Sequence, residues 1–183
     1  MADPATAREN VVLIGFMGTG KSSIGRLLAA RLHFKFVDTD QLIIKEAGCE
    51  IPQIFAERGE AHFRELETAA LSSLAQAERR VIATGGGIVV REENRPLLRT
   101  LGLVVALTAS EEVIFQRVSR NKKRPLLQTP NPRETIAQML AAREPLYAGA
   151  AQFSVDTSDL THAEVAEAIM EEARRVFSWQ APG

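Results

Sequence analysis

The sequence contains little cysteine, few aromatic residues and no excess of charge of either sign. Its 183 residues include one cysteine, one tryptophan and one tyrosine, and the formal net charge is −1. Cys49 cannot form an intramolecular disulfide by itself, which is typical of a reducing compartment. We expect Cys49 to be structural, because no histidine apart from His62 lies near it in the sequence. A nearly balanced charge provides no basic field that would attract a nucleic acid.

Long apolar runs are also absent. The run at residues 11–16 is too short for the apolar core of a signal peptide and far too short to cross a bilayer. We therefore expect a cytoplasmic protein with no membrane or nucleic-acid partner. Since no expected helix carries an exposed apolar stripe long enough to require a partner, we expect a monomer.

Short apolar runs alternate with helical patterns along the whole chain. This alternation is typical of βαβ units, and it predicts a three-layer α/β/α fold with a five-stranded parallel sheet flanked by helices. The expected strands lie at 10–15, 34–40, 79–87, 103–109 and 153–157. The expected helices lie at 22–32, 41–47, 51–58, 60–77, 92–100, from 110 onward, 132–142 and 161–176. Residues 1–9 and 178–183 are expected to be flexible termini.

A glycine-rich stretch follows the first expected strand. Residues 15–22, here named the phosphate loop, have the sequence GFMGTGKS and match G-x-x-x-x-G-K-[ST] between a strand and a helix. Glycines allow successive N–H groups to point at phosphate oxygens, Lys21 can reach the β- and γ-phosphates, and the Ser22 hydroxyl can bind Mg²⁺. The stretch predicts ATP and Mg²⁺ binding. GTP is not expected, because the guanine-recognition pattern N-K-x-D is absent.

Two acids end the second expected strand. Asp38 and Asp40 stand two residues apart, and strand alternation would turn both to one side of the sheet. One could lie near Mg²⁺ through a water molecule, and the other could bind a substrate hydroxyl and accept its proton. The alternative is a solvated loop end in which Asp40 caps the next helix.

Arginines and further glycines follow at intervals. Arg64 has Glu67 three residues later, which could orient it. Residues 85–87 are three consecutive glycines, here named the glycine loop, and they predict a backbone that comes close to a ligand. Arg124 lies in a long basic, proline-rich loop that has the character of a lid, and Arg143 lies beyond it. Each arginine alone could be a solvated surface residue, so the prediction rests on the set.

The chain is similar to the shikimate kinases in six motifs, which occur in that family's order and spacing. They are GFMGTGKSSIGRLLA, FVDTDQLI, IFAERGEAHFRELE, ATGGGIV, KKRPLL and AAREPLY. The resemblance implies a fold like that of the nucleoside monophosphate kinases in one domain at 10–177. It implies a substrate-binding helical segment at about 41–70 and a lid at about 119–132. The implied reaction transfers the γ-phosphoryl group of ATP to the 3-hydroxyl of shikimate, in the pathway to chorismate and the aromatic amino acids.

The resemblance also implies roles for individual residues. Asp40 would be the base, with Lys21 and Arg124 as the other catalytic residues. The resemblance and the phosphate-loop motif together imply an ATP site in which Arg117 stacks on adenine. Its residues would be Gly18, Thr19, Gly20, Lys21, Ser22, Ser23, Arg117 and Arg124. Shikimate would contact Asp40, Arg64, Gly86, Gly87, Arg143, Phe55 and Phe63, with Glu67 holding its neighbours. Mg²⁺ would be bound by Ser22 and, through water, by Asp38.

One part of the family pattern is missing. Members often place a long polar or basic side chain near adenine after the last strand, whereas residues 155–162 here contain no lysine or arginine. Two other hypotheses stay open from the sequence: a gluconate-type kinase of the same fold, and a nucleotide-binding regulator without activity. The paired arginines and the RPLL lid argue against the first, and the presence of every motif residue argues against the second.

Overall fold

The computed structural model describes residues 8–119 and 130–178. The strands are β1 (Val11–Ile14), β2 (Lys35–Asp38), β3 (Arg80–Ala83), β4 (Leu103–Thr108) and β5 (Phe153–Asp156). The helices are α1 (Lys21–Leu32), α2 (Thr39–Ala47), α3 (Ile51–Ser73), α4 (Asn94–Leu101), α5 (Glu111–Ser119), α6 (Pro132–Ala150) and α7 (His162–Phe177). No helix within these described ranges is both long enough and apolar enough to cross a membrane.

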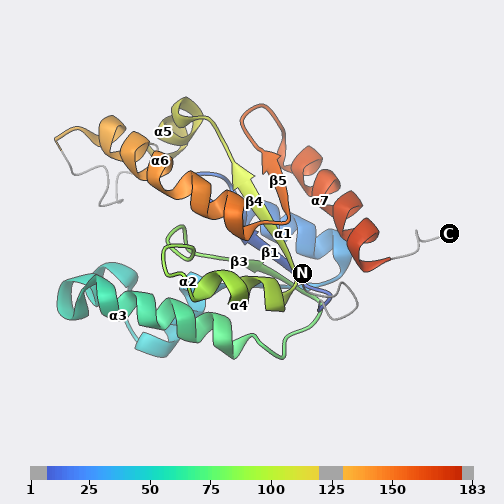
Figure 1. Cartoon of the computed structure of the whole chain (residues 1–183), viewed down its shortest axis with the longest axis horizontal. Helices are drawn as coiled ribbons and strands as arrows, with labels where there is room; N and C mark the ends of the chain where they lie inside the picture. Colours follow the sequence, from blue (N-terminus) through green and yellow to red (C-terminus); the bar gives the residue numbers. More distant parts are fainter. Residues whose placement is uncertain (1–7, 120–129, 179–183) are drawn as a thin grey trace.

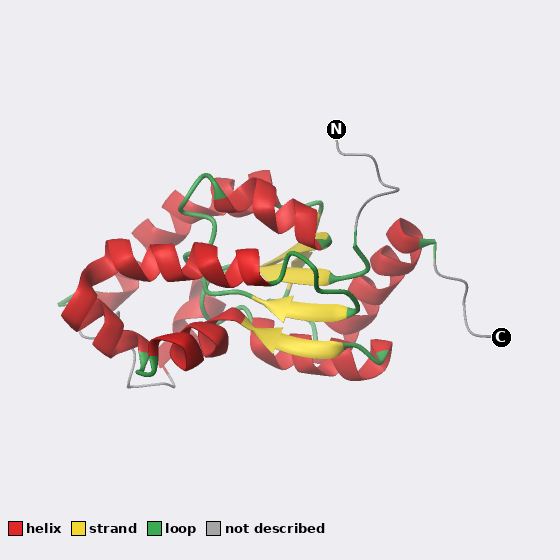
Figure 2. Cartoon of the chain, turned by 90° about the horizontal axis from the view of Figure 1, so that it is seen from below, coloured by secondary structure: helices red, strands yellow, loops and turns green. Residues whose placement is uncertain are grey.

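The sheet confirms the predicted fold class. Its five strands have the order β2-β3-β1-β4-β5, and every neighbouring pair is parallel. Val11 of β1 pairs with Val81 of β3 on one side and with Leu103 of β4 on the other. Figure 2 shows the strands pointing the same way, so their carboxyl ends meet at one edge. That edge is where open α/β sheets bind ligands.

Helices cover both faces of the sheet, as Figure 1 shows. Val11 and Leu13 pack with residues of α1 and α7, whereas Val12 and Ile14 pack with residues of α3, α4, α5 and α6. All four residues of β1 are fully buried, which explains why the strand is a continuous apolar run instead of an alternating one. A smaller cluster around Ile43, Ile54 and Phe63 joins α2 to α3.

Several predicted boundaries were wrong. The strands expected at 34–40 and 79–87 are shorter than predicted, since β2 ends at Asp38 and β3 ends at Ala83. The break expected between the helices at 51–58 and 60–77 is confirmed, because Gly59 (φ 78°, ψ 173°) interrupts the helical backbone of α3, but the second helix ends at Ser73 and not at 77. The helix expected at 132–142 continues through Pro145 to Ala150. Proline removes one helical hydrogen bond, but continuing α6 buries Tyr147 and Ala150, which belong to the same apolar cluster as β4. Arg124 and most of the predicted lid lie at 120–129, outside the described residues.

Candidate active site

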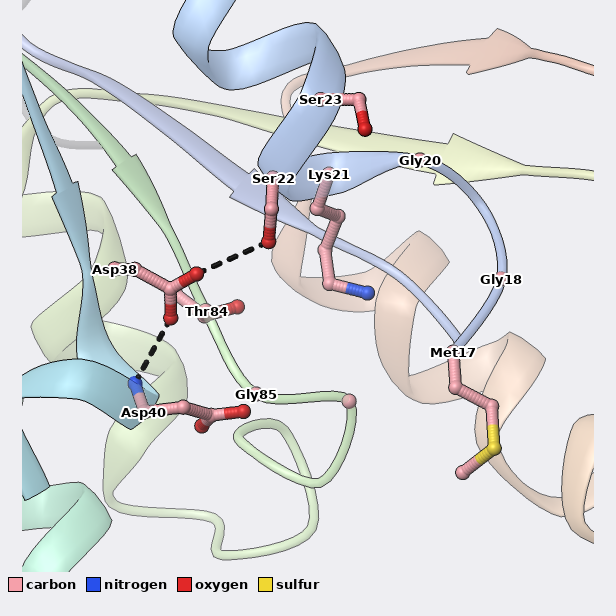
Figure 3. A pocket seen from close by; sticks show the side chains of 11 residues that line it. Met17, Gly18, Gly20, Lys21, Ser22, Ser23, Asp38, Asp40, Thr84 and Gly85 are labelled. Atoms are coloured by element: carbon pink, nitrogen blue, oxygen red, sulfur yellow. Dashed lines mark hydrogen bonds between the residues drawn. The ribbon is translucent and has the colours of Figure 1, made fainter. Parts of the chain in front are cut away.

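A cavity of about 370 Å³ opens at the carboxyl edge of the sheet, as Figure 3 shows. It is lined by Met17, Gly18, Gly20, Lys21, Ser22, Ser23, Asp38, Asp40, Thr84, Gly85 and Gly86. One wall is the phosphate loop between β1 and α1, and the other consists of the end of β2 and the start of the glycine loop after β3. The parallel sheet therefore brings three predicted motifs, far apart in the sequence, to one cavity.

The phosphate loop has the backbone that its glycines permit. Gly18 and Gly20 have φ angles of 81° and 91°, in the left-handed region that side chains disfavour. A Cβ on Gly18 would also lie 3.1 Å from Cγ2 of Val118 in α5. Gly20 is the N-cap of α1, so the positive end of that helix faces the cavity that Gly20 lines. These features favour binding of a phosphate chain.

The side chains of the phosphate loop have different tasks. The Lys21 Nζ donates to the carbonyls of Gly15 and Phe16, each at 2.8 Å, which holds the ammonium against the loop. Thr19 is buried, and its hydroxyl donates to the Phe16 carbonyl at 2.8 Å, so this side chain stabilises the loop itself. Ser23 is exposed and lines the cavity. The cavity wall thus offers the Lys21 ammonium and the Ser23 hydroxyl beside the helix terminus.

Asp38 and Asp40 do not lie on one strand as the sequence analysis predicted. Because β2 ends at Asp38 and Asp40 lies in the first turn of α2, strand alternation does not relate them. Asp38 caps α2 by accepting from the Asp40 N–H at 3.1 Å, so the alternative in which Asp40 is the cap was also wrong. The second oxygen of Asp38 accepts from the Ser22 hydroxyl at 3.0 Å. Asp38 faces the phosphate loop, and Asp40 faces the glycine loop (Figure 3).

The Ser22–Asp38 pair fits a magnesium ion. Mg²⁺ prefers oxygen ligands and usually keeps several waters, with few protein ligands and the phosphates of a substrate completing its shell. The described residues contain no group of three or more histidine, cysteine or acidic side chains that could hold a metal by themselves. An ion held here would therefore bind through the Ser22 oxygen, through Asp38 and through the nucleotide.

Asp40 and Glu67 both pack against the bare Cα of Gly85. A Cβ on Gly85 would lie 2.7 Å from Oδ1 of Asp40 and 3.0 Å from Oε1 of Glu67. Glu67 is 1% exposed. Burial raises its pKa above the usual value, and the nearby Asp40 acts in the same direction, against the opposing effect of Arg64. Within the described residues, Oε1 of Glu67 accepts no hydrogen bond.

Arg64 is held in place by two acids of its own helix. Its Nη1 donates to Glu67 at 2.6 Å, which confirms the predicted orienting role of Glu67, and its Nη2 and Nε donate to Glu60 at 2.8 and 3.2 Å. The guanidinium lies 5.5 Å from the centre of the Phe63 ring. A Cβ on Gly87 would lie only 1.9 Å from Nη1, so the glycine loop and Arg64 are in direct contact.

Arg143 approaches the glycine loop from α6. Its Nη1 lies 3.5 Å from the Gly86 carbonyl oxygen, and the guanidinium lies 5.8 Å from the centre of the Phe16 ring. The Tyr147 hydroxyl donates to the same carbonyl. Arg64 and Arg143 do not line the cavity itself, but they converge on Gly86 and Gly87 at its end.

The remaining predicted residues lie at the margins. Phe55 is 39% exposed, and its ring centre lies 4.6 Å from that of the buried Phe63. Arg117 donates to the Gly18 carbonyl at 3.3 Å and to the hydroxyl and carbonyl of Thr157 at 2.9 and 2.7 Å. Arg117 therefore links the phosphate loop to the segment after β5. Its stacking on adenine stays a prediction.

Sequence reasoning did not assign Thr84 or Tyr147 to the site, and it gave Met17 and Gly85 no role beyond their place in the phosphate loop and the glycine loop. Met17, Thr84 and Gly85 line the cavity, and Gly85 is where two carboxylates meet a glycine. Tyr147 shares a face of α6 with Arg143, four residues earlier, but the helix expected from the sequence ended at 142, before both residues.

Comparison with known proteins bears on what this site does. A family model described as shikimate kinase matches residues 17–174. A shikimate kinase of Thermodesulfovibrio yellowstonii is 49% identical over 168 residues, which cover 92% of this chain and 96% of the relative. The chain belongs to the shikimate kinase family.

Other members of the family extend the match. A shikimate kinase of Geobacter sulfurreducens is 52% identical over 158 residues, which cover 86% of each chain. The solved structure of an Acinetobacter baumannii shikimate kinase in complex with shikimate is 37% identical, with a TM-score of 0.85, and the match covers 94% of this chain and 95% of that one. The similarity to shikimate kinases thus includes the sheet, the phosphate loop and the elements that carry Arg64 and Arg143.

Proposed function

We propose that this chain transfers the γ-phosphoryl group of ATP to the 3-hydroxyl of shikimate, giving shikimate 3-phosphate and ADP. Membership of the shikimate kinase family supports this reaction. The observation that carries it is that a phosphate loop and Asp40 line one cavity, and two arginines converge on the glycine loop at its end.

ATP would bind through the phosphate loop. Its backbone N–H groups and the N-terminus of α1 would bind the phosphates, with Lys21 at the β- and γ-phosphates. Gly18, Thr19, Gly20, Ser22 and Ser23 would complete the nucleotide site, with Arg117 at adenine. Ser22 and, through water, Asp38 would hold Mg²⁺, which neutralises charge on the phosphates when it is bound.

Shikimate is a small anion with neighbouring hydroxyl groups, and the far end of the cavity suits those two properties. Arg64 and Arg143 would bind its carboxylate, because a planar guanidinium pairs well with a carboxylate. The backbone of Gly86 and Gly87 would add N–H donors. Phe55 and Phe63 would form the apolar wall beside the ring.

Asp40 would act as the general base. Its carboxylate would accept the proton of the 3-hydroxyl while that oxygen forms a bond to the γ-phosphorus and the bond from phosphorus to the ADP oxygen breaks. Lys21, and Arg124 from the lid, would stabilise the charge on the transferring group. Closure of the lid would exclude water, which otherwise would take the phosphoryl group.

The experiment that tests this proposal measures ADP release with ATP and Mg²⁺, with no acceptor, with shikimate, with gluconate and with nucleoside monophosphates. We expect release that depends on shikimate. Release with another acceptor would keep a kinase and reject the assignment of the arginines. ATP binding without release under any condition would favour a nucleotide-binding regulator.

We further propose that the chain forms one domain at 10–177 and works as a monomer in the cytoplasm, without a nucleic-acid or membrane partner. Its net charge of −1 supports the absence of a nucleic-acid partner. Light scattering after size exclusion should give a mass near the 20.0 kDa of one chain. Twice that mass would contradict the monomer.

A further inference from the structure

The carbonyl group of Gly86 receives two donors from one face of α6. The Tyr147 hydroxyl donates to its oxygen, and the Arg143 guanidinium lies 3.5 Å from it. Arg143 and Tyr147 are four residues apart and therefore neighbours on the helix. Tyr147 is 3% exposed, so its ring is anchored in the apolar cluster beneath the sheet edge.

In the glycine loop, the carbonyls of Gly85 and Gly87 and the N–H of Gly85 already have hydrogen-bond partners. The carbonyls of Gly85 and Gly87 accept from the N–H groups of Ile88 and Val90, at 3.2 and 3.0 Å, and the Gly85 N–H donates to Thr39 at 3.2 Å. The N–H groups of Gly86 and Gly87 donate no hydrogen bond within residues 8–119 and 130–178. Successive free N–H groups of this kind form an anion-binding concavity.

The direction of the Gly87 N–H depends on the Gly86 carbonyl, because the two groups belong to one peptide unit. That peptide is trans, so its C=O and N–H point in opposite directions. Glycines on both sides give this peptide unusual rotational freedom. Without a fixed carbonyl, the peptide could turn over and present an oxygen where an N–H is needed, beside Arg64 and Arg143, where an anion would bind.

We propose that Tyr147 is a positioning residue for the acceptor site, which fixes the Gly86–Gly87 peptide so that the Gly87 N–H serves the substrate carboxylate. The inference rests on the proposed function, since it assumes that Arg64 and Arg143 bind a carboxylate. Tyr147 does not touch the substrate. It acts through the Gly86 carbonyl, from the side opposite to the Gly87 N–H.

A buried tyrosine also needs a hydrogen-bond partner for its own sake, so the test must separate positioning from stability. Burial raises the pKa of Tyr147 to about 12. The hydroxyl therefore stays a donor throughout the pH range of an enzyme assay. A purely structural hydroxyl would change the melting temperature and leave the binding of substrate carboxylate unchanged.

The test uses Tyr147→Phe, which keeps the buried ring and removes the donor. We expect the KM for shikimate to rise about 3- to 10-fold, the range for losing one buried hydrogen bond, with the KM for ATP within about twofold of wild type. The methyl ester of shikimate lacks the charged carboxylate and serves as the second acceptor. The wild-type preference for shikimate over this ester should shrink by about the same factor in Tyr147→Phe.

Ser73→Ala is the control, because it also removes a hydroxyl-to-carbonyl hydrogen bond, of 2.7 Å to Ala70, but at the far end of α3. It should leave both KM values unchanged. A Tyr147→Phe protein with a lower melting temperature and an unchanged KM for shikimate would overturn the positioning role. So would an equal loss for shikimate and its ester. Wild-type protein without shikimate-dependent turnover would instead overturn the proposed function on which the inference rests.

Discussion

The contact between Gly87 and Arg64 allows a single methyl group to test the acceptor site. In Gly87→Ala, the new Cβ would lie 1.9 Å from Nη1 of Arg64, whereas ordinary contact begins near 3.4 Å. Gly87 is not among the glycines with positive φ, so alanine fits the backbone there. The whole effect of the substitution should therefore be a displacement of the guanidinium by about 1.5 Å.

The size of the effect follows from what Nη1 does. The same nitrogen donates to Glu67 at 2.6 Å, and a displacement of about 1.5 Å breaks that bond. A hydrogen bond between charged groups is worth about 1.5–3 kcal/mol, which corresponds to about 10- to 150-fold in an equilibrium constant. The same displacement would move Arg64 away from the substrate carboxylate that it is proposed to bind, and loss of that charged hydrogen bond should raise the KM for shikimate by this factor, while the KM for ATP stays within about twofold of wild type.

The assay is steady-state ADP release with each substrate varied in turn. Gly149→Ala is the matched control, because no atom lies within 4 Å of its new Cβ. It lies in α6 and should leave both KM values unchanged, with equal or slightly higher thermal stability. A Gly87→Ala protein whose KM for shikimate is within twofold of wild type would refute the assignment of Arg64 to the acceptor.

Three other substitutions test the remaining assignments. Asp40→Asn keeps the packing against Gly85 and should lower kcat by about 10²- to 10⁴-fold with normal ATP binding by calorimetry; near-normal kcat would remove Asp40 as the base. Arg143→Ala should raise the KM for shikimate about 10-fold or more and leave that for ATP unchanged, and equal changes in both would argue against a carboxylate contact. Burial raises the pKa of Glu67 in the folded state, so its stabilising contribution is complete below the unfolded-state pKa and is lost as pH rises through the folded-state pKa. Glu67→Gln cannot ionise, so it does not lose this contribution at high pH. The melting temperature of Glu67→Gln minus that of wild type should therefore be higher at about pH 8 than at about pH 4; the same difference at both pH values would contradict this.

The sequence alone predicted the fold and the phosphate loop because both are local patterns. Buried strands alternate with helices in the chain, and eight consecutive residues contain the whole phosphate-loop motif. Arg64 and Glu67 were also accessible, since their contact joins residues three apart on one helix.

The missed features depend on contacts between distant segments. The contact of Tyr147 with Gly86 joins residues 61 apart, and nothing near either one indicates it. The end of β2 at Asp38 and the direction of Asp40 toward Gly85 follow from how α2 and the glycine loop pack. Similarly, α6 continues through Pro145 because residues beyond it are buried against the sheet, and a local helix-breaking signal does not include that gain.

The most direct test of the account is to identify the product. Protein, Mg²⁺, ATP and shikimate would be incubated, and the phosphorylated product examined by ³¹P–¹H correlation NMR, with ADP measured in the same sample. The account predicts one phosphate monoester, coupled to the proton on carbon 3 of shikimate, in amounts equal to ADP. An ester at another oxygen, or ADP formed without any shikimate ester, would contradict the placement of the 3-hydroxyl between Asp40 and the γ-phosphate.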